Sequence, residues 1–98
     1  MILPVFILFL PVMVYHVLGI ERFEGIAKKT GKPYDFTRFY SVPSRQPDKV
    51  RGVRVENVDV YNGQYAPDIS DIHPEDYVDF SFNRRGYVDA VQIVDSPN

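Results

Sequence analysis

Alternating apolar and polar positions predict strands along most of this chain. Residues 14–27 form a first candidate strand, in which Gly19 and Gly25 interrupt the alternation. Glycine inside a strand is typical of a bulge or a sharp bend. A polar turn at residues 28–33 leads into a second candidate strand over residues 34–42. Because the turn is short, the two segments are expected to pair as an antiparallel hairpin.

Three more strands are predicted in the second half of the chain, over residues 52–61, 77–82 and 87–94. In the first of them the alternation slips at Glu56 and Asn57, which indicates a bulge. The polar connector at residues 64–75 has room for one short helical turn, capped by Ser70 or Asp71. Gly86 lies where a tight turn needs positive φ. The pattern predicts an all-β domain, a small barrel of five antiparallel strands.

The apolar start of the chain has several interpretations. Residues 1–20 carry no formal charge and are long enough to span a bilayer. They lack the basic region of a signal peptide, and Pro4 and Pro11 would break a helix there. We favour a dispensable apolar extension over residues 1–12, followed by the domain at residues 13–98. The alternatives are a membrane or signal segment and a tail that packs on the barrel or on a partner.

Composition narrows the picture. A chain of 98 residues makes one domain, and the absence of cysteine excludes disulfides and thiolate metal sites. Charge is uneven: residues 22–54 hold nine basic and three acidic residues, hence +6, whereas residues 55–98 hold two basic and nine acidic residues, hence −7. This polarity indicates a basic face on an otherwise acidic body whose overall net charge is −2.

The second strand places aromatic rings and an arginine on one of its faces. These side chains either face the core, with Arg38 at the edge, or form a platform on which bases stack. Lysines in the preceding turn and arginines elsewhere would neutralise phosphates. The predicted nucleic-acid-binding residues are Lys28, Lys29, Lys32, Tyr34, Phe36, Arg38, Tyr40, Arg54 and Arg84.

Catalytic motifs are absent from the sequence. His16 and His73 are far apart, and no nucleophile motif, phosphate-binding glycine loop or zinc-protease motif occurs. The acidic residues between positions 68 and 76 do not have the spacing of a calcium-binding loop. We therefore expect no enzyme activity, no cofactor and no metal.

One long segment resembles a known family. VLGIERFEGIAKKTGKPYDFTRFYSV, residues 17–42, resembles the N-terminal half of filamentous-phage single-stranded DNA-binding proteins, also called helix-destabilising proteins. The similarity lies in the first strand, the Gly-Lys-Pro-Tyr turn and the aromatic strand, and it extends more weakly over residues 13–95. It implies an OB-like five-stranded barrel, a homodimer that assembles cooperatively, and largely sequence-independent coating of the phage genome during replication and before packaging. The more acidic C-terminal half departs from that family.

The resemblance further implies single-stranded DNA as the partner, with RNA as the alternative, and a location in the cytoplasm of the bacterial host. A different function is predicted if residues 1–20 are a real anchor. The chain would then be a membrane-tethered small β-domain, associated with the inner membrane, that acts in phage assembly or as an interaction protein.

Overall fold

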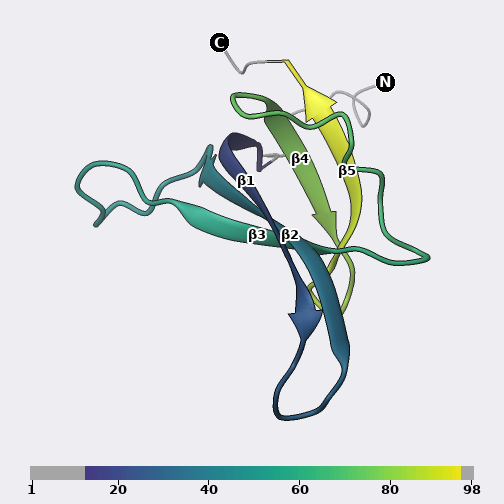
Figure 1. The fold of residues 1–98 in the computed structure, drawn as a ribbon. Coiled ribbons are helices and arrows are strands. Elements are labelled where there is room, and N and C mark those ends of the chain that lie inside the picture. The colour runs from purple at the N-terminus through teal and green to yellow at the C-terminus, as the bar shows by residue number, and fades with distance from the viewer. Residues whose placement is uncertain (1–12, 96–98) are drawn as a thin grey trace.

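The fold is a single sheet of five antiparallel strands (Figure 1). The computed structural model describes residues 13–95, so the predicted extension at residues 1–12 lies outside the described residues. The sheet has the order β3-β2-β1-β4-β5. Its strands are β1 Tyr15–Ile26, β2 Pro33–Pro43, β3 Glu56–Tyr61, β4 Tyr77–Phe82 and β5 Val88–Val94. The prediction of an all-β domain with five antiparallel strands is confirmed. Within residues 13–95 there is no helix that could cross a membrane.

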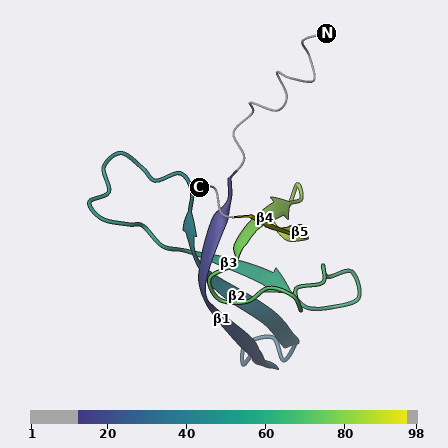
Figure 2. The ribbon, with the colours of Figure 1, turned by 90° about the horizontal axis from the view of Figure 1, so that it is seen from above.

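The sheet curls like an OB-type domain, but hydrogen bonds do not close it into a barrel. β1 pairs with β2 from Tyr15 to Ile26 but with β4 only at Tyr15 and His16. The far half of the β1–β2 hairpin therefore projects beyond the rest of the sheet (Figure 1). The edge strands β3 and β5 approach each other across the remaining gap. Figure 2 shows the 44–55 loop and the 62–76 connector leaving the sheet on opposite sides.

The core lies on the concave face of the sheet. Val17, Phe39, Val60 and Val78 are wholly buried there, and Phe80 packs against the Phe39 ring with centroids 5.4 Å apart. Full burial of such apolar side chains is the main source of stability in a domain of this size.

A bulge in β1 decides which side chains face the core. The register with β2 shifts between Val17 and Gly19, so Leu18 is an extra residue, and the irregularity predicted near Gly19 is confirmed. A shift of one residue moves the following side chains to the other face of a strand. As a result Val17 points inward, but Glu21 and Phe23 lie on the outer face. Gly25 causes no register shift.

The third strand is shorter than predicted. It begins at Glu56, and its register with β2 runs without a shift, so the predicted bulge at Glu56 and Asn57 is wrong. The preceding residues belong to a loop that the Gln46 side chain closes, accepting a hydrogen bond from the Arg54 N–H at 2.7 Å and donating to the Pro43 carbonyl. The alternating apolar residues before Glu56 therefore lie in a loop, although their spacing is that of a strand.

The connector between β3 and β4 consists of turns, and the predicted helical turn is wrong. Asp68 accepts hydrogen bonds from the N–H and the hydroxyl of Ser70, at 3.0 and 2.7 Å, in place of a helix cap. The turn glycines behave as expected, since Gly31 has φ of 70° and Gly86 has φ of 85°.

Candidate nucleic-acid interface

Three lysines lie at the tip of the projecting hairpin. The loop is closed by hydrogen bonds from the Ala27 N–H to the Lys32 carbonyl at 2.9 Å and from the Gly31 N–H to the Ala27 carbonyl at 2.8 Å. The positive φ of Gly31 lets the chain reverse within this short loop. Lys28, Lys29 and Lys32 are exposed, and none forms an ion pair with a described residue. The tip therefore carries a concentrated positive charge.

The aromatic face of β2 is the outer face of the sheet. Thr37, Phe39 and Ser41 point to the core, so Tyr34, Phe36 and the other side chains of their parity point away from it. Of the two interpretations of this strand, a core-facing set of rings is therefore wrong. The outward rings of β2 pack against residues of β1, the other strand of the hairpin.

Two close contacts fix these rings. Phe23 lies opposite Phe36, and the two rings are stacked with centroids 5.1 Å apart. The Tyr34 ring lies over Gly25, where an added Cβ would approach the Tyr34 hydroxyl oxygen to 2.7 Å. A side chain at position 25 would therefore push the Tyr34 ring out of its observed position.

The rings continue across the sheet as a row. Ring centroids are 6.2 Å apart for Tyr34 and Phe36, 5.6 Å for Phe36 and Tyr61, and 5.4 Å for Tyr61 and Tyr87. Tyr34, Tyr61 and Tyr87 are 42, 51 and 49% exposed. We call these four residues, Tyr34, Phe36, Tyr61 and Tyr87, the aromatic row. It crosses from the projecting hairpin to the edge where β3 meets the β4–β5 hairpin.

Arg38 is not a free cation. Its guanidinium donates two hydrogen bonds to the Asp59 carboxylate, at 2.8 and 3.1 Å, and it lies 5.2 Å from the Phe23 ring centroid and 5.5 Å from that of Phe36. The bonds to Asp59 raise the pKa of Arg38 further above its usual range. A bidentate pair of this kind is geometrically specific. Arg38 therefore holds the ring pair in place, with its charge balanced by Asp59.

Tyr40 is also engaged. Its hydroxyl donates a hydrogen bond of 2.6 Å to the Glu21 carboxylate, and this bond raises the pKa of Tyr40. Its half-buried ring lies against Gly19. On the outer face of β2, Arg38 comes between Tyr40 and Phe36, so Tyr40 stands outside the aromatic row.

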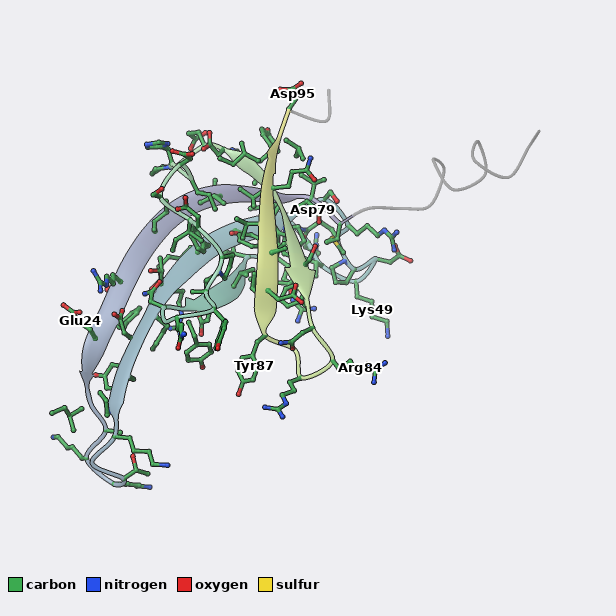
Figure 3. The ribbon with its side chains drawn as sticks, turned by 90° about the vertical axis from the view of Figure 1, so that its right-hand side faces the viewer. Glu24, Lys49, Asp79, Arg84, Tyr87 and Asp95 are labelled. Atoms are coloured by element: carbon green, nitrogen blue, oxygen red, sulfur yellow. The ribbon has the colours of Figure 1, made fainter. Side chains whose placement is uncertain are left out.

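The two remaining predicted residues lie in different places. Arg84 is exposed in the β4–β5 turn, where the Asn83 side chain accepts hydrogen bonds from the backbone N–H groups of Arg85 and Tyr87. Figure 3 shows Arg84 and Tyr87 at the same end of the β4–β5 hairpin, with Asp95 at the other end. Arg54 precedes β3 and lies at the opposite end of that strand from Tyr61.

The structure thus brings six of the nine predicted residues to the aromatic row or its two ends, namely Lys28, Lys29, Lys32, Tyr34, Phe36 and Arg84. It adds three rings that the sequence reasoning missed. Phe23 could have been found, because residues equally distant from the centre of a hairpin turn face each other. Tyr61 and Tyr87 come together only through the curl of the sheet, for which the sequence offers no local signal.

The described residues contain no group of three histidine or acidic side chains that could hold a metal ion. The described part of the chain belongs to the class of small open β-domains, and its outer face carries a row of four rings, three of them exposed, between two basic turns. No family model, no curated protein and no solved structure matches it.

Proposed function

We propose that this protein binds single-stranded DNA without catalysing a reaction and largely without regard to base sequence. The observation that carries the proposal is the aromatic row on the outer face, with lysines at one end and the β4–β5 turn with Arg84 and Arg85 at the other. Proteins that bind single strands combine basic residues for the backbone with rings on which successive bases stack.

In this mechanism the two basic ends hold phosphates, and the rings between them take bases. Stacking of a base on an exposed ring contributes about 1–3 kcal/mol. A duplex offers its phosphates but keeps its bases stacked inside, so it would lose the ring contacts. The preference for single strands would therefore come from the rings. The lysines would attract the negatively charged backbone from a longer distance.

The wider role follows from the resemblance of residues 17–42 to the phage helix-destabilising proteins. On that basis we propose a homodimer that coats single-stranded phage DNA during replication, in the cytoplasm of the bacterial host. RNA is the alternative polymer, because base stacking and phosphate contacts do not distinguish ribose from deoxyribose.

The proposal is tested by titrating the full-length protein with single-stranded oligonucleotides of about 15 nucleotides and with the matching duplex. The chain has seven tyrosines and no tryptophan, so its intrinsic fluorescence reports directly on tyrosine stacking. We expect quenching and tight binding with the single strand, and weaker binding with the duplex. Equal affinity for both would refute the role of the rings.

A matched pair of variants identifies the rings that act. Tyr61→Ala should weaken binding by roughly five- to 150-fold, the equivalent of the stacking energy of one base. Tyr65→Ala removes a ring that is 89% exposed and lies outside the row, and it should leave affinity unchanged. If both variants bind like the parent and melt at the same temperature, the aromatic row is not the binding surface.

A further inference from the structure

A cleft opens where the edge strand β3 meets the β4–β5 hairpin. Its volume is about 380 Å³, within the range of small-ligand sites. The free edge of β3 forms one wall, and the turn at Gly86 lies on the other side. The residues that the argument uses are Tyr15, Glu56, Tyr61, Phe82 and Tyr87, all of which line the cleft. Because Tyr61 and Tyr87 also belong to the aromatic row, a strand stacked on the row would pass the mouth of this cleft.

The cleft contains polar groups without partners. Tyr15 lines the cleft and is only 8% exposed, and no hydrogen bond joins its hydroxyl to another of residues 13–95. The hydroxyl itself is not fully enclosed, since the fully buried side-chain polar atom without a partner in that range is Ser41 Oγ. In the same part of the chain the Glu56 carboxylate forms neither a hydrogen bond nor an ion pair. Burial, and secondly the charge of Glu56, raises the pKa of the Tyr15 hydroxyl, so the hydroxyl remains a donor at neutral pH. A ligand in the cleft can therefore bond to both groups without displacing a hydrogen bond within the protein.

A second cleft, remote from the first in its lining residues, provides a contrast. It is lined by Arg22, Asn62 and Asp68 among others. Arg22 is bonded to Asp35, Asn62 donates to Asp35 and Thr37, and Asp68 accepts from Ser70. These polar groups are already satisfied by the protein, so that cleft offers a ligand little to recognise.

We propose that the cleft beside β3 is a subsite for one unstacked guanine base of the bound strand. This inference rests on the proposed single-strand binding and adds to it a base preference at one position. The preference is compatible with largely sequence-independent binding, because only one base of each site would enter the cleft while the others stack on the row.

Guanine fits the donors and acceptors of the cleft better than the other bases. Its Watson–Crick edge presents one acceptor, O6, beside two adjacent donors, N1–H and the N2 amino group. A tyrosine hydroxyl can donate to O6, and the two oxygens of the Glu56 carboxylate can accept from both donors. Thymine presents one donor between two acceptors, whereas adenine and cytosine each offer a single amino donor at that edge. The rings of Tyr61, Tyr87 and Phe82 supply apolar faces for the base.

The test compares three oligonucleotides of about 15 nucleotides with the full-length protein: all thymidine, thymidine with one central guanosine, and thymidine with one central inosine, which lacks the N2 amino group. A bidentate base contact gives about five- to 150-fold discrimination. We expect guanosine to bind tighter than thymidine by a factor in that range, with inosine in between.

Two variants and a control assign the preference to the cleft. Glu56→Gln replaces one acceptor oxygen by a donor and should bring the guanosine-to-thymidine ratio close to one. Tyr15→Phe removes the hydroxyl donor and should lower the same ratio. Asp89→Asn makes the same charge change as Glu56→Gln on an exposed β5 residue outside the cleft, and it should keep the parent ratio.

The outcomes separate the two proposals. If the oligonucleotides bind but guanosine and thymidine bind equally, or if Glu56→Gln and Tyr15→Phe both keep the parent ratio, the guanine subsite is refuted and single-strand binding stands. If no oligonucleotide binds, the proposed function fails and the subsite fails with it. Affinity for the all-thymidine strand shows that each variant is folded.

Discussion

The lysines at the hairpin tip give the sharpest quantitative prediction. Replacing Lys28 and Lys29 together by alanine removes two charges from an exposed turn whose backbone bonds run between Ala27, Gly31 and Lys32. Neither lysine forms an ion pair with a described residue, so the fold should not depend on them. Any change in binding is then attributable to lost phosphate contacts.

The magnitude follows from counterion release. Each phosphate contact on a single strand contributes about 0.7 to the slope of log affinity against log salt concentration. Two lost contacts should therefore reduce the slope by about 1.4. Between about 50 and 200 mM salt, the parent protein should lose roughly sevenfold more affinity than the variant.

The assay is a titration with a single-stranded oligonucleotide at four or more salt concentrations, in which the quenching of tyrosine fluorescence reports the bound fraction. Replacing Lys49 and Arg51 by alanine is the matched control, because it removes the same charge from the 44–55 loop, which follows the end of β2 remote from the tip (Figure 1). The control should keep the parent slope within experimental error. Equal slope changes in both variants would show that net charge alone governs binding, and an unchanged slope in the Lys28 and Lys29 variant would remove the tip from the site.

Two further predictions concern the fold that supports this face. Phe39→Ala should lower the free energy of unfolding by about 3–5 kcal/mol in urea, because the Phe39 ring is wholly buried against Phe80; a loss below about 1 kcal/mol would mean that Phe39 is not at the centre of the core. The hydrogen bond to Glu21 raises the pKa of Tyr40 in the folded state, so its stabilisation is present below the usual tyrosine pKa of about 10 and is lost as pH rises through the raised value. The difference in melting temperature between the parent and Tyr40→Phe should therefore narrow above about pH 10, and a constant difference across that range would contradict the assignment.

The hairpin could be predicted because its signals are local. Alternation gave bounds for β1 and β2 within one residue of the observed Tyr15–Ile26 and Pro33–Pro43. The turn residues between them, with Gly31 at positive φ, specify the reversal without any tertiary contact. The same holds for β4 and for the turn that contains Gly86.

The predictions that were wrong concern features that depend on contacts between residues apart in the sequence. Val53 and Val55 have the spacing of a strand, but Gln46 holds the backbone of Arg54 in a loop, and both valines are exposed. The partner of Arg38 is Asp59, on a strand whose register with β2 the sequence does not specify. A count of charges along the chain therefore assigned Arg38 to the nucleic acid, although the fold assigns it to a carboxylate.

That pairing bears on how the outer face would work. With Arg38 balanced by Asp59 at 2.8 Å, the middle of the face carries no net charge from this pair, and its unpaired cations lie at the two ends. A free arginine beside the Phe23–Phe36 pair would draw a phosphate onto the rings and displace the bases that should stack there. Held by Asp59, its guanidinium instead covers the ring pair and fixes its orientation. On the proposed function, pairing Arg38 thus sacrifices one phosphate contact but separates the part of the face that attracts the backbone from the part that receives the bases.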